Sequence, residues 1–413
     1  MPSISLCFRV HQPYCLKKYA FKDIDVQHNY DDAGINAATI DIVANECYLP
    51  ANEIILSLIK KTKGEFKVAF SISGTVLELL QQYRPDVIVS FKALVDTGYV
   101  EILAETYNNS LSWLHSKKEF AAQIEKHGTL IKKLFNIEPV VFRNTELIYN
   151  NELAKFIADA GYKGILCEGL AKILKGRTAN QTYASPDNGD FGILLRNVEL
   201  SDDIAFRFGQ TSWSQHPLTA KKFAEWIHRH TSIDTCNINL FFDYETFGIH
   251  KKIDSGIFEF LKYLPEAVLS NPEFKFKTPT EALDNCYPKD IYNVPNTISW
   301  KDKTVDCCMW SSNVMQHNTI KKLYSLEKLV LKSENEKVID TWRKFQAVDY
   351  FYFMSAHQRC EGDASHLLNP FNSSKEAYQN FSNILTDFEI FTIKSDLKNN
   401  KNRFSKQEHS ILY

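Results

Sequence analysis

Seven short runs rich in β-branched and aromatic residues recur between residues 4 and 245, and helical patterns lie between many of them. Each run is mostly apolar rather than alternating, which is typical of strands buried on both faces of a parallel sheet. Strands that alternate with helices predict right-handed crossover connections. We therefore expect an α/β fold with a closed or nearly closed barrel, whose strands are residues 4–10, 67–73, 100–105, 140–146, 164–169, 192–197 and 237–245.

The pattern changes after about residue 290. Three amphipathic helical stretches follow, at residues 312–334, 337–357 and 373–391, with no strand pattern between them. A helical bundle appended to a barrel is the simplest account. The expected division is a catalytic barrel at 1–285, a bundle that completes the cleft at 286–395, and a polar tail at 396–413.

Composition narrows the function classes. The net charge is −2, so the basic excess of a nucleic-acid-binding protein is absent and no nucleic-acid partner is expected. No secretory signal is visible, and the apolar runs are shorter than the ~20 residues of a membrane helix, so no membrane partner is expected. The nine cysteines form no CxxC pair and predict reduced thiols in a cytoplasmic protein. No set of His, Asp and Glu has the spacing of a zinc site, so no metal and no cofactor are expected.

Polar side chains collect where the predicted strands end. The carboxyl ends of parallel strands meet at one mouth of a barrel, so these side chains are expected to share a polar, acidic cleft. Paired carboxylates without a metal are the groups that glycoside hydrolysis uses: one attacks or activates water, and the other holds a proton. The residue pattern alone leaves open which carboxylates these are among Glu105, Glu146, Glu168, Asp202, Asp203, Asp243 and Glu245.

Three stretches together resemble conserved regions of glycoside hydrolase family 57, and in particular its α-amylase-like branch. They are HQP at 11–13, EILAETYNNSL at 101–111 and FFDYETFG at 241–248; GTVLELL at 74–80 and EGDASHLLNPF at 361–371 are weaker counterparts of two further regions. The resemblance implies a (β/α)7 barrel followed by a helical bundle. It also implies that Glu105 is the nucleophile and Asp243 the acid/base, with Glu245 as a neighbouring acid.

The resemblance implies a retaining, two-step hydrolysis of α-1,4-glucans. The alternatives on the same site are a 4-α-glucanotransferase and a branching enzyme. A metal-dependent deacetylase and an inactive sugar-binding barrel are less favoured, because Gln12 rather than an aspartate follows His11 and both catalytic carboxylates are present. The family often has a histidine where this chain has Arg9.

The expected substrate contacts come from strand ends, loops and the bundle. We also expect Arg143 or His11 to keep Glu105 ionised, and Asp243 to lie in the more enclosed position. The predicted contacts are His11, Gln12, Arg143, Asp203, Glu245 and Asp363, with Trp213 and Trp310 as sugar platforms.

Overall fold

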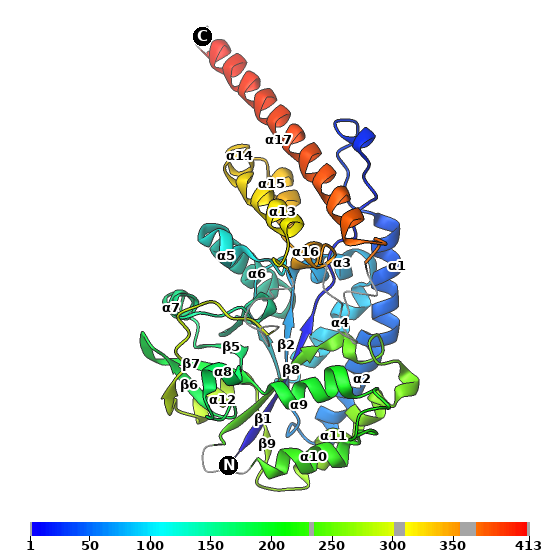
Figure 1. Cartoon of the computed structure of the whole chain (residues 1–413), viewed down its shortest axis with the longest axis vertical. Coiled ribbons are helices and arrows are strands. Elements are labelled where there is room, and N and C mark those ends of the chain that lie inside the picture. The colour runs from blue at the N-terminus through cyan, green and yellow to red at the C-terminus, as the bar shows by residue number, and fades with distance from the viewer. Residues whose placement is uncertain (1, 231–234, 301–309, 356–368, 411–413) are drawn as a thin grey trace.

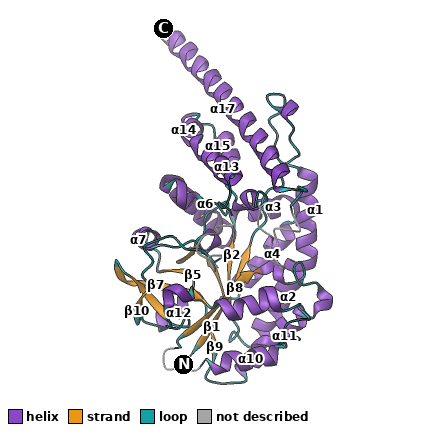
Figure 2. Ribbon diagram, viewed as in Figure 1, coloured by secondary structure: helices purple, strands orange, loops and turns teal. Residues whose placement is uncertain are grey.

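Strands lie at the centre of the molecule, with helices around them (Figures 1 and 2). Seven of these strands pair in parallel as a ring. The computed structural model describes residues 2–230, 235–300, 310–355 and 369–410. The strands of the ring are β1 (Ser3–Val10), β2 (Val68–Ile72), β3 (Val100–Leu103), β4 (Val141–Arg143), β5 (Gly164–Glu168), β7 (Asn188–Arg196) and β8 (Asn237–Asp243). Within the described residues their parallel pairings run β1–β2–β3–β4–β5–β7–β8 and return to β1. A single bridge, Ala104–Phe142, joins β3 to β4, and a single pair, Arg196–Asn239, joins β7 to β8. All seven predicted runs form strands of this ring, which confirms the predicted fold class.

Three short strands that the sequence did not reveal extend the sheet. β6 (Thr182–Ser185) pairs antiparallel with β7, β10 (Asp290–Ile291) pairs with β6, and β9 (Lys275–Phe276) pairs with the start of β1. The chain therefore still follows the barrel at residues 290–291. The predicted division at residues 285 and 395 stays a prediction.

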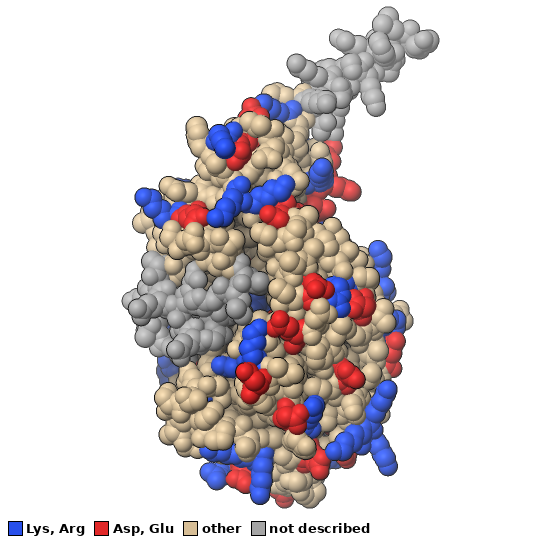
Figure 3. All heavy atoms as spheres, turned by 90° about the vertical axis from the view of Figure 1, so that its right-hand side faces the viewer, with Lys and Arg blue, Asp and Glu red and all other residues tan. Residues whose placement is uncertain are grey.

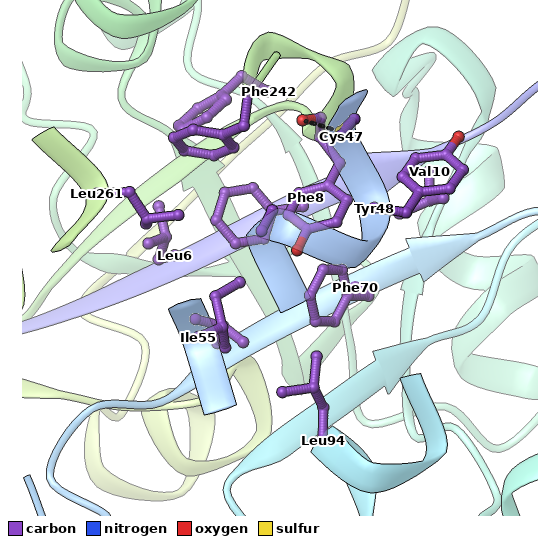
Figure 4. Close-up of a cluster of buried hydrophobic side chains, with 14 of the residues drawn as sticks. Leu6, Phe8, Val10, Cys47, Tyr48, Ile55, Phe70, Leu94, Phe242 and Leu261 are labelled. Carbon is purple, nitrogen blue, oxygen red and sulfur yellow. Dashed lines mark hydrogen bonds between the residues drawn. The ribbon is translucent and has the colours of Figure 1, made fainter. Parts of the chain in front are cut away.

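Helices cover the outside of the ring and bury the apolar faces of its strands. Figure 4 shows one such layer, in which Phe8 of β1 and Phe70 of β2 pack against Ile55, Leu94 and Leu261 from the surrounding helices. The barrel helices are α1 (Ala33–Val43), α2 (Leu49–Lys61), α3 (Gly74–Tyr83), α4 (Pro85–Val95), α5 (Ser112–His115), α6 (Lys117–Phe135), α7 (Asn151–Asp159), α8 (Ala171–Leu174), α9 (Val198–Asp202), α10 (Ala220–Arg229), α11 (Ile257–Leu269) and α12 (Pro279–Asn285).

A π-helical turn at Ala44–Tyr48 joins α1 to α2 into one continuous helix. Pro50 has no N–H to offer the Glu46 carbonyl, so the ordinary helical bond cannot form there. The amide of Leu49, one residue before the proline, bonds to the carbonyl of Ala44, five residues back. Such π turns recur at functional sites because they re-aim single side chains. Here the turn directs Tyr48 toward the barrel mouth.

The helix Ala33–Lys61 is also long and apolar enough, by length and composition, to cross a membrane. Half of its most apolar window is buried inside the protein. Ile40 and Ile55 on that side are fully buried in the core. A buried core helix passes the same test, so this one helix is weak evidence for a membrane.

The C-terminal part is helical, as predicted, but two of its three predicted helices are each divided. α13 (Val314–Ser325) and α14 (Glu327–Lys332) replace the first, α15 (Glu336–Lys344) and α16 (Val348–Tyr352) replace the second, and α17 (Ser374–Ser410) is the third. Between α15 and α16, Ala347 bridges to Ser110, and the amide of Val348 bonds to the carbonyl of Asn109. The bundle is thereby attached to the loop after β3, at the mouth of the barrel.

Cys236 and Cys286 form a disulfide, so the prediction of reduced thiols is wrong for this pair. The two cysteines are 50 residues apart in the sequence. Their pairing depends on the barrel, which brings the start of β8 beside the end of α12. Cys7, Cys15, Cys47 and Cys167 are free and buried, and a cytoplasmic location stays a prediction.

Acidic and basic side chains are interspersed on the face seen in Figure 3. No large area of that face carries a single sign. This distribution agrees with the small net charge of the chain.

The loop after β8 provides a test of the packing against the π turn. Gly248 has φ +98°, and a Cβ placed on it would lie 1.8 Å from the Glu46 carbonyl oxygen. Gly248→Ala should therefore lower the free energy of unfolding by about 2 kcal/mol or more. The matched control is Gly128→Ala on α6, where nothing lies within 4 Å of the added methyl group and stability should not fall. Thermal unfolding measures both; equal melting temperatures for the two variants would contradict the packing described.

Candidate active site

One polar side chain from each ring strand lies at the mouth of the barrel. Along each strand, alternate side chains point into the ring. The inward-pointing residues further from the mouth are apolar or small, and all are buried: Cys7, Ala69, Leu103, Val141, Leu166, Leu194 and Phe241. Two residues further along the chain from each of these lie Arg9, Ser71, Glu105, Arg143, Glu168, Arg196 and Asp243, of which Glu105 follows the end of β3. The period of two therefore produces a polar layer directly above an apolar one, at the end of the barrel where active sites form.

The charges in this polar layer alternate around the ring, and each carboxylate has an arginine. Arg9 Nη1 lies 3.0 Å from Asp243 Oδ1, and Arg143 Nη2 lies 3.7 Å from Glu105 Oε2. Arg196 pairs with Glu168 at 3.1 Å, and also with Asp202 outside the layer. Three arginines thus balance three strand-end carboxylates. Isolated buried charges would be far more costly than these pairs.

Glu105 is the most enclosed of the predicted catalytic groups. Its side chain has no exposure, and Ser71 Oγ donates a hydrogen bond of 2.9 Å to Oε1. The Glu105 amide faces His127 Nδ1 at 3.5 Å, and His127 Nε2 lies 2.8 Å from the Ile72 carbonyl oxygen. Burial lowers the pKa of His127, which keeps this imidazole neutral. The predicted contact of Arg143 with Glu105 is present.

Asp243 is more open than Glu105, so the predicted order of enclosure is wrong. Its side chain is 30% exposed, because Asp243 is the last residue of β8 and lines a pocket at the mouth. Glu105 instead lies behind Arg143. Burial disfavours the charge on Arg9, but the carboxylates of Asp243, Glu146 and Asp349 together raise the pKa of Arg9. Arg9 therefore stays a cation beside Asp243.

Glu245 is the buried carboxyl beside Asp243. Tyr48 Oη and Gln12 Nε2 both donate to its Oε1, at 2.5 and 3.2 Å. Burial, with the Asp243 charge as a second cause, raises the pKa of Glu245 to about 7. Gln12 thus contacts a site acid in this structure, and Glu245 can hold a proton near neutral pH.

His11 connects the barrel to the bundle. Its Nδ1 lies 2.6 Å from Ser73 Oγ, and its Nε2 lies 2.9 Å from Asp349 Oδ2 on α16. Burial opposes the charge on Asp349, but His11 and Arg9 hold the pKa of Asp349 below its usual value. Asp349 was not among the site residues predicted from the sequence. The only local feature that could have indicated it is an acidic residue inside the aromatic run VDYFYF at 348–353. Asp363, the predicted contribution of the bundle, lies outside the described residues.

Three other predicted contacts, Asp203, Trp213 and Trp310, are not among the residues that line the pocket. Asp203 pairs with Arg207 Nε at 2.5 Å, and burial raises the pKa of Asp203. Arg207 in turn stacks on Trp213, whose ring meets Trp226 edge-on at 6.0 Å. Trp310 is buried and packs edge-on against Tyr352.

The pocket itself is lined by both charged and apolar side chains. Three arginines and two carboxylates face it together with aromatic rings, which is the mixture that polar ligands with apolar faces require. The lining residues are Arg9, Arg143, Glu146, Leu147, Arg196, Ala205, Phe206, Phe241, Phe242, Asp243, Thr246, His250 and Trp300. Within the described part of the chain, no group of three or more His, Cys, Asp and Glu residues has the geometry of a metal site.

Comparison with known proteins identifies the family of the chain. The profile of Glycosyl hydrolase family 57 matches residues 5–295, which is most of the chain. The chain belongs to glycosyl hydrolase family 57. This family 57 chain is 37% identical to a putative alpha-amylase of Methanocaldococcus jannaschii, over 98% of this chain and 89% of the relative.

Two solved structures share the fold of this family 57 enzyme. The 4-alpha-glucanotransferase of Thermococcus litoralis superposes with a TM-score of 0.66 at 18% identity, covering 85% of this chain and 56% of that one. The GH57-type branching enzyme of Pyrococcus horikoshii superposes with a TM-score of 0.62 at 14% identity, covering 89% of this chain and 88% of that one. At these identities the likeness concerns the fold.

Because the pKa of Glu245 is raised, we expect the folding stability of the enzyme to depend on pH. The pKa is about 7 in the folded enzyme and 4.5 for an ordinary glutamate, so the folded state holds this proton more tightly than the unfolded state. Between pH 4.5 and 7 the Glu245 contribution must therefore become less favourable to folding as the pH rises. Glu245→Gln removes this dependence. As the pH rises from 5 to 8, the free energy of unfolding of the variant should therefore increase by on the order of 3 kcal/mol relative to that of the parent.

Denaturant unfolding of both proteins at the two pH values measures the effect. Glu225→Gln, at an exposed position of α10, is the matched control and should follow the parent at both pH values. A Glu245→Gln variant whose stability runs parallel to the parent would mean that Glu245 is ionised throughout this range.

Proposed function

We propose that this family 57 enzyme is a retaining glycosidase that acts on α-1,4-glucans. The observation that carries the proposal is the placement of Glu105 and Asp243 at one barrel mouth, each beside its own arginine. Support for the substrate comes from the relative named putative alpha-amylase, which aligns with 98% of this chain. Glycoside hydrolysis with retention needs two such carboxyl groups and no metal.

In the proposed first step, Asp243 gives its proton to the glycosidic oxygen while Glu105 attacks the anomeric carbon. The bond to the leaving sugar breaks, and a covalent glycosyl–enzyme forms on Glu105. Asp243, now ionised, then takes a proton from water, whose oxygen attacks the anomeric carbon and frees Glu105.

Substrate binding has to rearrange the pocket before the first step. The retaining route needs the two carboxyl groups about 5–5.5 Å apart with one sugar between them. Glu105 is enclosed behind Arg143, so the entering sugar has to displace the Arg143 guanidinium. The separation of 3.7 Å between Arg143 Nη2 and Glu105 Oε2 is longer than a hydrogen bond, which makes Arg143 easier to move.

Transfer to a sugar acceptor is the second candidate for the same site. It uses the same intermediate, with a glucan hydroxyl in place of water. The observation that favours it is that structural neighbours include a 4-alpha-glucanotransferase and a branching enzyme. Incubation with maltoheptaose distinguishes the reactions: shorter sugars alone indicate hydrolysis, longer sugars in addition indicate transfer, and new α-1,6 linkages indicate branching.

Variants of the two carboxyl groups test the assignment. Glu105→Ala should abolish turnover, and azide should partly restore it by forming a β-glycosyl azide in the vacated space. Asp243→Ala should lose least activity on substrates whose leaving group needs no proton. Product analysis on starch and on an activated glycoside measures both effects.

Glu101→Gln is the matched control for these variants. Glu101 is also a carboxyl of β3, half-buried, but it accepts hydrogen bonds from Thr280 at the opposite end of the strand from the pocket. Burial raises the pKa of Glu101, so glutamine should replace it with little effect on turnover. Activity on starch close to that of the parent for either alanine variant would overturn the assigned pair.

Chelation tests the less favoured deacetylase chemistry. Because both proposed steps use only carboxyl groups, turnover should survive prolonged treatment with EDTA. The assay compares starch hydrolysis before chelation, after it, and after zinc is added back. Complete loss that added metal restores would favour a metal-dependent reaction.

A further inference from the structure

Two aromatic rings face the pocket beside the proposed catalytic residues. The rings of Phe206 and Trp300 are parallel within 3°, with centroids 6.0 Å apart. Both side chains are partly exposed and line the pocket together with Arg9 and Asp243. Of the tryptophans that the structure describes, Trp300 alone belongs to the pocket lining. Apolar faces next to a charged cluster match a sugar ring, whose C–H face is apolar and whose hydroxyl groups are polar.

Trp300 is held in this position by Glu146. The backbone N–H of Trp300 donates to the Glu146 carbonyl at 3.2 Å, and its indole Nε1 donates to Glu146 Oε2 at 2.6 Å. Tyr352 Oη of α16 donates to the same carboxylate oxygen at 2.7 Å. The polar edge of the indole is thus bonded within the protein. The ring itself is partly exposed and lies parallel to the Phe206 ring in the pocket lining.

The backbone around Glu146 is unusual in a way that points to a functional position. Glu146 has φ +55° and Leu147 has φ +49°, a left-handed conformation that side chains with a Cβ rarely adopt. Such strain persists where the surrounding structure enforces it, and it is concentrated at ligand sites. Here the antiparallel bridge between Tyr149 and Ile298 fixes the segment that carries Trp300 to the loop after β4.

We propose that Trp300 is the platform on which a sugar ring of the glucan stacks, and that Glu146 is a positioning residue that fixes the indole. The proposal rests on the proposed function and adds a substrate-recognition residue to it. Trp300 lies just before the C-terminal helices, and Tyr352 extends from them. The platform is therefore assembled from the barrel and the bundle together, with the Glu146 carboxylate between them.

The test compares steady-state kinetics on maltoheptaose for Trp300→Ala, Trp300→Phe and Glu146→Gln. Loss of one aromatic contact should raise KM roughly fivefold to tenfold in Trp300→Ala with a smaller change in kcat. Trp300→Phe should recover part of the affinity, because it keeps a ring face without the N–H. Glu146→Gln should raise KM as well, because an amide is a weaker acceptor for two donors than a carboxylate.

Tryptophan fluorescence gives a second readout that a purely structural role would not alter. Maltoheptaose should quench the emission of the parent, and the quench should vanish in Trp300→Phe. The matched control is Trp226→Phe, because Trp226 packs against Trp213 away from the pocket; this variant should keep both the quench and the parent KM.

The possible outcomes distinguish failure of the Trp300 proposal from failure of the proposed glycosidase function. If the parent cleaves maltoheptaose and Trp300→Phe keeps the full quench, or if folded Trp300→Ala keeps the parent KM, the platform is overturned and the glycosidase stands. If the parent neither binds nor cleaves malto-oligosaccharides, the proposed function fails and the platform fails with it.

Discussion

The alternating charges at the barrel mouth are the interaction on which the rest of the site depends. Arg143 and Arg196 are buried, Arg9 is 17% exposed, and each of the three is paired with a carboxylate of a neighbouring strand. Removing one partner of such a pair leaves an uncompensated buried charge, which typically costs about 3–5 kcal/mol. The arginines therefore fix where the proposed nucleophile and the proposed acid/base lie, and they leave a layer that is neutral overall.

The pairing of these charges also affects how a sugar can bind. Because the charges already pair with one another, substrate binding has to replace contacts within the protein, and the contact of Arg143 with Glu105 is the first of these. Glu245 lies outside the layer and, with a pKa of about 7, is a neighbouring carboxyl that can hold a proton beside Asp243. The bundle reaches the same region through Asp349, bonded to His11, and Tyr352, bonded to Glu146. The C-terminal helices thus contribute polar groups to the mouth as well as covering it.

The sequence predicted those features that follow from local periodicity. The seven apolar runs became the seven ring strands, and the positions of Glu105 and Asp243 at the ends of their runs placed both at one mouth. Features that depend on which strand ends meet were not predictable: the ion pair of Arg9 with Asp243, the contact of Asp349 with His11, and the Cys236–Cys286 disulfide each join residues 50 or more positions apart. Trp300 could not be told from core tryptophans, because nothing local shows that Glu146 binds its indole N–H.

The retaining mechanism is tested most directly by trapping its covalent intermediate. A 5-fluoro-α-glucosyl fluoride slows both steps but keeps a good leaving group, so the glycosyl–enzyme should accumulate. Intact-mass analysis should show one added sugar, and peptide mapping should place it on Glu105. A label on Asp243 or Glu146, or turnover of the parent with inverted anomeric configuration and no label, would contradict the account.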